Sequence, residues 1–388
     1  MDTGDSSNLR IATPPWITDP GAHRAVALEV LLHGPLSRSE IARRLDLSPG
    51  SLTRLSAPLI ESGLLVEVGE RGDGKAGRPS RPLDVVPASR HFIGMKLMGD
   101  QVLGAVTDLR AEVLGSLSAT LTSQEPDAVV EVIGQMAERL AALVPSVTAL
   151  GIGVGGLLDE HGTVISAPFL GWEGVPLAAL VEARSSIPTV VANDLVAFTE
   201  YEHWFGAARG LERFAVITLG AGIGYGLVAN GRIVANEDSG IGLVGHWPID
   251  PYGPVCPAGH RGCARSIMTQ AAIVTAVSTA LDRPVTYDEA LSLAADGEAA
   301  ARRVVDDAGR GLGKLLAAVA NLTVPQMIVL GGEGVGLVDV ARDAVRAGMA
   351  EDRDPRAHEI PLVTTTGDNT EWCRGAAVIA IQTYVLGS

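Results

Sequence analysis

The sequence predicts an α/β protein with two parts, an N-terminal winged helix-turn-helix and a larger two-lobed body. Near the N-terminus, helical segments with clear capping residues lead into two short strands that flank a polar, glycine-rich loop, and this order is typical of a winged helix. After Pro87, apolar strands and helices alternate to the end of the chain, which is typical of an α/β body. A hairpin with a glycine turn occurs once in each half of that body, at 93–108 and 214–234, which favours two lobes.

The composition indicates a compact protein of more than one domain. The chain has 388 residues, of which 47% are hydrophobic, and its 46 glycines suit an α/β body with many tight turns. No apolar run reaches the roughly 18–20 residues of a membrane span, and the N-terminus lacks the basic and apolar regions of a signal peptide. We therefore expect a cytoplasmic protein without a membrane partner. Its 3 cysteines are too few for a disulfide framework.

The net charge of -15 argues against DNA binding if the chain is taken as one body. The charge is unevenly distributed, because residues 1–90 hold 11 of the 30 basic residues and 11 of the 45 acidic residues. The N-terminal part is therefore neutral, and the rest of the chain carries the whole negative charge. A neutral head can approach the phosphates of DNA while an acidic body is repelled from them.

Capping signals define the two helices of the helix-turn-helix. Ser37 is an N-cap residue and Glu40 follows it at the capping-box spacing, so the pair begins the first of these helices. After a short turn, Ser48 caps the second helix and Pro49 fits its first position. We expect Pro58 to kink or shorten this second helix. The other elements of the head are a helix over 22–31 and strands over 64–68 and 82–86.

The second helix of a helix-turn-helix lies in the major groove of DNA, and the first helix braces it. Small hydroxyl side chains near its N-terminus allow close approach, and Arg54 can reach guanine or phosphate. Arg38 begins the bracing helix, where it can meet a backbone phosphate. Arg78, in a Gly-Arg-Pro turn of the wing, can enter a narrow minor groove, although a solvated loop explains it equally simply. The candidate DNA contacts are Arg38, Ser48, Ser51, Thr53, Arg54 and Arg78. The alternative for the whole head is a small protein-interaction domain.

Apolar periodicity predicts the remaining elements of the body. The expected helices cover 128–143, 265–281, 299–320 and 372–386, and the expected strands cover 150–156, 189–192 and 327–330 besides the two hairpins. Tyr201, Trp204 and Phe205 fall on a helix that follows Asp194, where we expect them to pack in the core or to form subunit contacts.

From about Ala22 to the end, the chain resembles the ROK family (repressors, open reading frames, kinases), and specifically its regulator branch. Each matching stretch is weak alone, but their order and spacing are specific. The stretches are Ile93–Asp108, Phe169–Leu177, Ala192-Asn193-Asp194, Leu219–Arg232, His246 with Cys256–Cys263, and Leu330-Gly331-Gly332. The resemblance implies an actin-like, ribonuclease-H-like pair of lobes that binds an effector and forms homodimers or tetramers.

The resemblance also implies a body that has lost its kinase chemistry. Asp194 matches the catalytic base of the ROK kinases, but Lys96 stands where they have an acid in the first phosphate loop. Met98-Gly99-Asp100 replaces their Gly-Gly-Thr turn, where Met98 blocks the approach of phosphate and Asp100 repels it. We therefore expect no ATP binding and no enzyme activity, with Asp194 as a vestigial base. Whether Lys96 is buried or partly paired stays open, and an active sugar kinase with an added head is the alternative.

Three polar groups that contact sugar in the family are replaced here, by Phe169, Leu243 and Arg265. The candidate effector-binding residues that remain are Asn193, Asp194 and His246. Arg265 favours an acidic or phosphorylated ligand such as a sugar phosphate or sugar acid, because guanidinium pairs with such groups. Drift in a disused pocket, which would make the protein an effector-independent regulator, explains the same substitutions.

The family's structural zinc is held by one histidine and three cysteines, and a closed tetrahedral site needs four ligands. This chain offers His246, Cys256 and Cys263, with Ala258 at the position of the middle cysteine. His260 lies nearby and could replace it. The alternative is a loop that these side chains support without a metal.

Together these observations predict a transcription regulator, a repressor of carbohydrate-related genes, that binds a double-stranded DNA operator. An effector, a sugar or a sugar derivative, would modulate its binding to that operator. The expected organisation is a flexible tail over 1–20, a winged helix-turn-helix DNA-binding domain over 21–87, and a ROK effector-binding and oligomerisation domain over 88–388.

Overall fold

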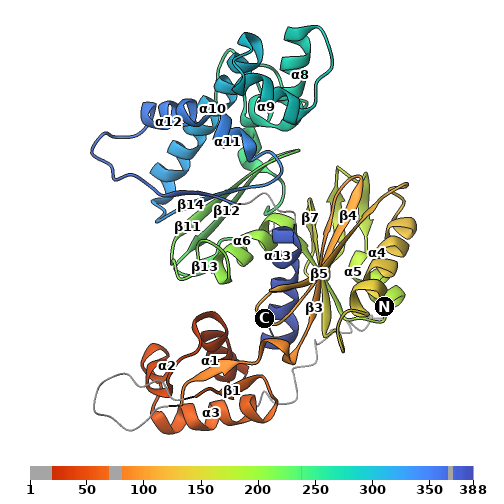
Figure 1. Cartoon of the computed structure of the whole chain (residues 1–388), viewed down its shortest axis with the longest axis vertical. Helices are drawn as coiled ribbons and strands as arrows, with labels where there is room; N and C mark the ends of the chain where they lie inside the picture. The colour runs from red at the N-terminus through yellow and green to blue at the C-terminus, as the bar shows by residue number, and fades with distance from the viewer. Residues whose placement is uncertain (1–19, 70–80, 237, 366–369, 388) are drawn as a thin grey trace, which may run out of the picture.

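The computed structural model describes residues 20–69, 81–236, 238–365 and 370–387 (Figure 1). Most of the predicted tail and the wing residue Arg78 lie outside these ranges, so neither is described. Pro20, which we had placed in the tail, already begins the first helix.

The N-terminal part is a winged helix-turn-helix, as predicted. Its capping box is present, because the Ser37 side chain accepts from the Glu40 N–H and the Glu40 side chain accepts from the Ser37 N–H. Pro58 lies in the last turn of the recognition helix and does not shorten it at that point, since the helix continues to Glu61. The elements are α1 (Pro20–His33), α2 (Arg38–Arg44), α3 (Pro49–Glu61), β1 (Leu65–Glu67) and β2 (Leu83–Val85).

The body contains two five-stranded sheets with the same strand order. In each sheet the first three strands form an antiparallel meander, and two parallel strands extend it on the other side of the first strand. The orders are β5-β4-β3-β6-β10 and β13-β12-β11-β14-β15. The first sheet consists of β3 (Phe92–Leu97), β4 (Gln101–Thr107), β5 (Val113–Thr120), β6 (Ala149–Val154) and β10 (Thr189–Asn193). The second consists of β11 (Phe214–Leu219), β12 (Ile223–Ala229), β13 (Arg232–Ile233), β14 (Ile328–Gly331) and β15 (Leu362–Thr364). This repeated topology confirms the two-lobed, ribonuclease-H-like body.

Helices cover both sheets. The first lobe carries α4 (Pro126–Ala141), α5 (Leu177–Ser185) and a small sheet of β7 (Leu157–Leu158), β8 (Val164–Ala167) and β9 (Trp172–Val175). The second lobe carries α7 (Ala264–Met268), α8 (Gln270–Leu281), α9 (Tyr287–Ala295), α10 (Ala299–Thr323), α11 (Gly336–Val340) and α12 (Arg342–Glu351). The single helix expected over 265–281 is two helices, because the Thr269 side chain caps a new helix at that point. None of the helices in the described ranges is long and apolar enough to span a membrane.

Two helices lie between the lobes, α6 (Asp194–Trp204) and α13 (Thr370–Ile381) (Figure 1). The last helix packs tightly on the first sheet, because glycines on two strands leave room for its backbone. A Cβ at Gly94 or at Gly151 would collide with the carbonyl oxygens of Cys373 and Ala376, respectively. Gly375 gives α13 an equally close contact with the backbone of α6.

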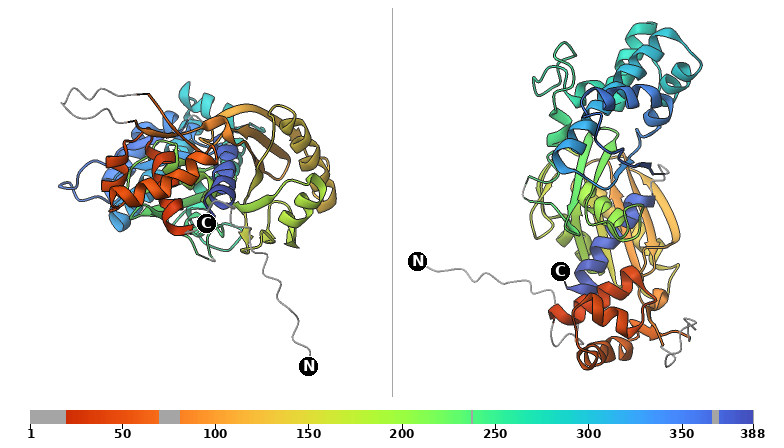
Figure 2. Two further views of the ribbon diagram at one scale, coloured as in Figure 1. Left: turned by 90° about the horizontal axis from the view of Figure 1, so that it is seen from below. Right: turned by 90° about the vertical axis from the view of Figure 1, so that its left-hand side faces the viewer.

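The head is packed onto the body by a shared hydrophobic core. Side chains of α1 and α3 belong to one buried cluster with Tyr201 and Trp204 of α6 and with the end of the chain, the π-helical segment η3 (Gln382–Leu386). Figure 2 shows this end of the chain beside the head. Arg110 of the body pairs with Asp84 of the head at 2.5 Å, and the Arg209 side chain donates to the Leu32 carbonyl. The predicted packing role of Tyr201 and Trp204 is thus confirmed.

Candidate DNA-binding, effector and metal sites

The first turn of α3 presents a polar, exposed surface. Ser48 caps the helix by accepting from the Ser51 N–H at 3.1 Å, and the hydroxyls of the two serines lie 2.9 Å apart. Thr53 is exposed and donates to the Pro49 carbonyl, so its methyl group is left for outward contacts. Arg54 is exposed and forms no ion pair with any residue that the structure describes. A free guanidinium on this helix is available for a base edge or a phosphate.

Arg38 does not project freely into solvent. Its guanidinium donates to the Glu67 carboxylate at 2.7 Å and to the Arg81 carbonyl at 3.4 Å. The other oxygen of Glu67 lies 3.6 Å from the Arg81 guanidinium. One carboxylate at the base of the wing therefore contacts two arginines, and hydrogen bonding to Arg38 lowers the pKa of Glu67.

In the body, Lys96 occupies the space beside the vestigial base. Its ammonium group forms an ion pair with Asp194 and lies 4.1 Å from the centre of the Trp372 ring. The lysine is buried, and its strand β3 faces the first residue of α6 here. The other Asp194 oxygen accepts from the Leu195 N–H at 2.8 Å. Both carboxylate oxygens thus have partners within the chain, which answers the question that the sequence left open for Lys96.

The Asn193 side chain is also engaged within the chain. Its oxygen accepts from the N–H groups of Leu195 and Val196 and so caps α6, while its nitrogen donates to the Gly156 carbonyl at 3.1 Å. The two predicted effector contacts Asn193 and Asp194 are adjacent, but each already has strong partners. Phe169 and Leu243, which we predicted to stand in place of sugar-contacting polar groups, are exposed by 53% and 63%.

Each glycine loop of the body has a carboxylate beside it. The β3–β4 turn is closed by a hydrogen bond from the Met98 N–H to the Gln101 carbonyl, with Asp100 exposed at its tip. In the second lobe, the carboxylate of Glu333 lies so close to Gly220 that a Cβ there would collide with it. A carboxylate at each loop opposes the binding of a nucleotide phosphate.

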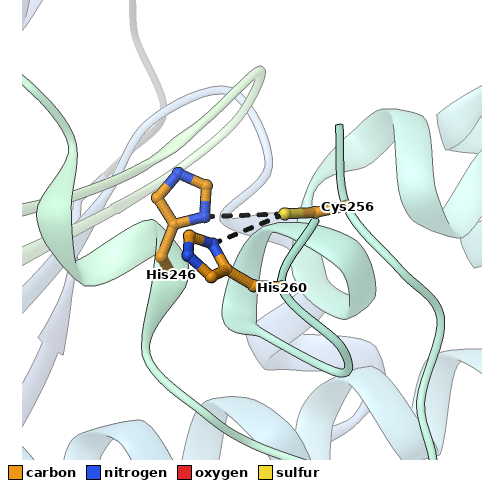
Figure 3. A group of neighbouring side chains, drawn as sticks. All are labelled: His246, Cys256 and His260. Atoms are coloured by element: carbon orange, nitrogen blue, oxygen red, sulfur yellow. Dashed lines mark hydrogen bonds between the residues drawn. The ribbon is translucent and has the colours of Figure 1, made fainter. Parts of the chain in front are cut away.

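Three side chains from the loop after β13 meet around one point (Figure 3). Cys256 Sγ lies 3.7 Å from His246 Nδ1 and 3.8 Å from His260 Nδ1. Cys263 Sγ lies 3.9 Å from the same nitrogen of His246. His260 is therefore the residue between the cysteines whose ring lies beside Cys256, on a tight turn in which the Cys256 N–H donates to the His260 carbonyl.

Two side chains of this cluster have shifted pKa values. Burial lowers the pKa of His246, with the nearby His260 and Arg265 acting in the same direction. Burial opposes ionisation of Cys256, but the N–H groups of His260 and Ala258 and the Cys263 thiol outweigh it and lower the pKa of Cys256. A neutral imidazole and a thiolate are the forms that bind transition metals.

These features define a class of proteins in which a winged helix-turn-helix is joined to a sugar-kinase-like body of two ribonuclease-H-like lobes. The family model described as "ROK family" matches residues 92–383, and the chain belongs to this family.

Curated relatives match most of the chain. The chain is 26% identical over 369 residues to the DNA-binding transcriptional repressor Mlc of Escherichia coli (strain K12), a match that covers 90% of each protein. It is 29% identical over 317 residues to the N-acetylglucosamine repressor of Escherichia coli O157:H7, covering 78% of this chain and 77% of that protein.

Solved structures extend the comparison. A ROK family transcriptional regulator described as a homologue of the E. coli MLC protein superposes with a TM-score of 0.81, at 25% identity and over 95% of this chain and 97% of that one. A ROK family glucokinase from Streptomyces griseus superposes with a TM-score of 0.66 at 24% identity, over 74% of this chain and 98% of its own. The glucokinase matches only the body of this chain, and the likeness between the two is one of fold.

Several side chains in these sites escaped the sequence prediction. Glu67 and Arg81 join Arg38 across 29 and 43 residues, and Lys96 meets Asp194 across 98 residues. Glu333 and Trp372 approach the body's loops from still more distant segments. No local pattern signals such contacts. Only the exposed position of Glu67 and Arg81 on opposite strands of one hairpin offers a hint from the sequence.

Proposed function

We propose that the protein is a DNA-binding transcription repressor of carbohydrate-related genes, in which residues 21–87 bind the operator and residues 88–388 bind an effector and form the oligomer. The exposed first turn of α3, with Arg54 unpaired among the described residues, is the observation that carries the proposal. The DNA contacts are Ser48, Ser51, Thr53 and Arg54 in the major groove and Arg38 on the backbone, with Arg78 in the minor groove.

The relatives support this function because two of them are named as repressors and the match with Mlc includes the head. A closed homodimer, or a pair of dimers, would place two heads on a palindromic operator in the cytoplasm. The relative named for N-acetylglucosamine supports a sugar or sugar derivative as the effector class.

A kinase with an added head is the second candidate, and the glucokinase-like fold of the body is the observation that favours it. The position of Lys96 argues against a kinase. Its ammonium group pairs with the Asp194 carboxylate, which would have to accept the proton of a sugar hydroxyl. Glu333 opposes it as well, by placing negative charge at the second phosphate loop. We therefore propose that the body binds no ATP and transfers no phosphate.

The effector signal would travel along α13. This helix begins beside Lys96, where Trp372 also stacks on Phe198 of α6 with ring centres 4.7 Å apart. It ends in the core that it shares with the head. Effector binding between the lobes would change their closure and, through this helix, the position of the head on the body.

We propose that His246, Cys256, His260 and Cys263 hold a structural zinc. In a tetrahedral site with Zn–S of about 2.3 Å and Zn–N of about 2.0–2.1 Å, neighbouring ligand atoms lie about 3.5 Å apart. The separations of 3.7, 3.8 and 3.9 Å in this cluster are close to that value. The metal would cross-link η2 (Leu243–His246) to the loop that carries the cysteines. Metal analysis of the purified protein should find about one zinc per chain, and His260→Ala should lower that content.

The decisive test of the proposed function is binding to the DNA upstream of the protein's own gene. We expect the wild type to shift this fragment, and Arg54→Ala to weaken binding by about 1–3 kcal/mol, or about 5- to 150-fold, because the main base contact is lost. Arg346→Ala, which removes an exposed arginine from α12 of the second lobe, is the matched control and should bind like the wild type. A wild type that binds no DNA would reject the proposal.

Activity and ligand assays separate the alternatives. A coupled assay with ATP and glucose should give no turnover, whereas turnover that disappears in Asp194→Asn would establish the kinase. A thermal-shift screen with neutral sugars, sugar phosphates and sugar acids should raise the melting temperature for one class. If no class raises it, the regulator is independent of an effector.

A further inference from the structure

The base of the wing carries a cluster that the recognition helix does not explain. Arg38, Glu67 and Arg81 come from α2, from the end of β1 and from the segment that leads into β2. They are brought together because the segment before α2 pairs with β2, with Leu36 and Leu83 exchanging backbone hydrogen bonds of 2.9 and 2.8 Å. The wing and the first helix of the helix-turn-helix therefore meet at this cluster.

The cluster lies where a DNA backbone would pass. In a winged helix, α3 occupies the major groove while the wing reaches the neighbouring minor groove, and the strand of phosphates between the two grooves crosses the start of the bracing helix. Arg38 is at that start, and Arg81 is at the root of the wing, with its side chain 68% exposed. Two guanidiniums at this point can each donate to a phosphate oxygen.

Glu67 determines how strongly the two arginines can bind a phosphate. Its carboxylate contacts both arginines, so the cluster carries one net positive charge instead of two. The other carboxylate near the start of α2 belongs to Glu40, which accepts from the N–H and the hydroxyl of Ser37 in the capping box. Glu67 is 36% exposed, and a phosphate that approaches the arginines would compete with it directly.

We propose that Arg38 and Arg81 form a phosphate clamp for the DNA backbone at the base of the wing, and that Glu67 weakens this clamp by competing with the phosphate. The proposal rests on the proposed DNA-binding function and adds to it a contact, Arg81, and a competing acid, Glu67. The clamp recognises phosphate and no base, so it acts on any duplex.

The salt dependence of binding tests the clamp, because each phosphate neutralised adds about 0.9 to the slope of log K against log salt concentration. The probe is a fluorescein-labelled duplex of random sequence, about 30 base pairs or three helical turns long. We expect Glu67→Gln to bind more tightly at every salt concentration. Its slope should be steeper by about one, equivalent to an additional factor of about three to four between 50 and 200 mM salt.

A mutant cycle distinguishes competition from a structural role. Arg81→Gln leaves the cluster neutral and should lower the slope by about one, and the double variant Arg81→Gln/Glu67→Gln restores one positive charge and should return the slope to the wild-type value. If Glu67 only pinned the wing to α2, then Glu67→Gln would weaken binding, and that sign would overturn the proposal. Unchanged slopes in all three variants would overturn it as well.

Glu61→Gln is the matched control, because it removes the same charge from an exposed carboxylate at the end of α3, before β1 begins. The slope of this variant should equal that of the wild type. A slope as steep as that of Glu67→Gln would show that the effect comes from the overall charge of the protein, and it would overturn the proposed clamp. A wild type that binds neither the random duplex nor the DNA upstream of its gene would reject both the proposed function and the clamp. If the wild type binds and the cycle fails, only the clamp is rejected.

Discussion

Lys96 places a cation beside Asp194 as part of the chain itself. The side chain is 9% exposed and that of its partner Asp194 is 17% exposed, so the pair is largely screened from water. A buried ion pair contributes little net stability compared with apolar side chains of similar size, but removing one partner leaves an unpaired buried charge. The position of Lys96 over Trp372 adds a cation–π contact that ties the pair to α13.

This arrangement predicts a strongly non-additive mutant cycle. Lys96→Met should lower the free energy of unfolding by about 3–5 kcal/mol, because it leaves the Asp194 carboxylate buried without its partner. The double variant Lys96→Met/Asp194→Leu should recover most of this loss, since both charges are removed. Urea unfolding followed by tryptophan fluorescence measures the free energy of unfolding of the wild type, the two single variants and the double variant. A double variant whose loss of stability equals the sum of the losses in the two single variants would show that the pair is not coupled.

Glu202, near the end of α6, is a second buried charge. Burial raises its pKa from 4.5 to about 7, despite the hydrogen bond that its carboxylate accepts from the Ala207 N–H at 2.8 Å. As pH rises from 4.5 to 7, the unfolded chain releases this proton while the folded chain retains it. The folded state therefore loses stability across that window, by up to about 3 kcal/mol at 1.36 kcal/mol for each pKa unit.

Glu202→Gln should remove this pH dependence. The amide oxygen can still accept from Ala207, and the side chain no longer ionises. The variant should melt at a higher temperature than the wild type at pH 8 and at a similar temperature at pH 4.5, as measured by differential scanning calorimetry. Glu160→Gln, at a side chain that is 88% exposed, is the control and should show no such difference. If Glu202→Gln raised the melting temperature by the same amount at both pH values, the result would contradict the role assigned to burial.

At the residue scale, local sequence signals predicted caps and positions but not partners. Ser48 could be placed at the start of α3 because a cap acts on its own helix, and the metal cluster could be found because three of its residues share one loop. The partner of Lys96 could not be found, because it lies 98 residues away and is chosen by the packing of β3 against α6. Arg38 was predicted to be free for phosphate, and its bond to Glu67 depends on strand pairing in the same way.

Among the elements, α13 and η3 connect several distant parts of the molecule. The helix runs over glycines of β3 and β6, contacts α6 through Gly375, and continues into a segment that packs against α1. The Tyr384 hydroxyl donates to the Thr189 carbonyl at 3.2 Å, which fixes this segment to β10 as well. One continuous element therefore connects the space between the lobes to the core of the head.

Removing η3 should detach the head. Deletion of residues 382–388 removes Val385 and Leu386, whose burial contributes about 1.5–3 kcal/mol each. We expect the truncated protein to lose DNA binding and to be cleaved by trypsin between head and body, while the body keeps its thermal transition. Deletion of Gly387 and Ser388 alone is the control and should bind normally. DNA binding at wild-type strength after the longer deletion would contradict this role for η3.

Elements with a strong local pattern were predictable and short ones were not. The capping box, the glycine hairpins and the amphipathic α10 follow from residue spacing. The strands β7, β8 and β9 have only two to four residues each, too few for a period to emerge, and their pairing comes from tertiary contacts. The break between α7 and α8 depends on one side chain, Thr269, which caps α8 by accepting from the Ala272 N–H.

For the whole molecule, two features of the sequence predicted the architecture. The repeated hairpin indicated two lobes, and the structure gives both lobes the same strand order. The uneven charge indicated a head suited to DNA on an acidic body. What the sequence did not reveal is that head and body share one core, because the residues that join them come from both ends of the chain and from α6.

That shared core has a consequence for how the protein is made. A ribosome completes the head's own helices first, but Val385 and Leu386 follow both lobes in the sequence. A nascent chain therefore carries an unfinished head until both lobes have been translated. Fragments released by premature termination would lack this part of the core, so they would not occupy the operator in place of the full-length regulator. The order of the sequence thus couples DNA binding to the synthesis of both lobes.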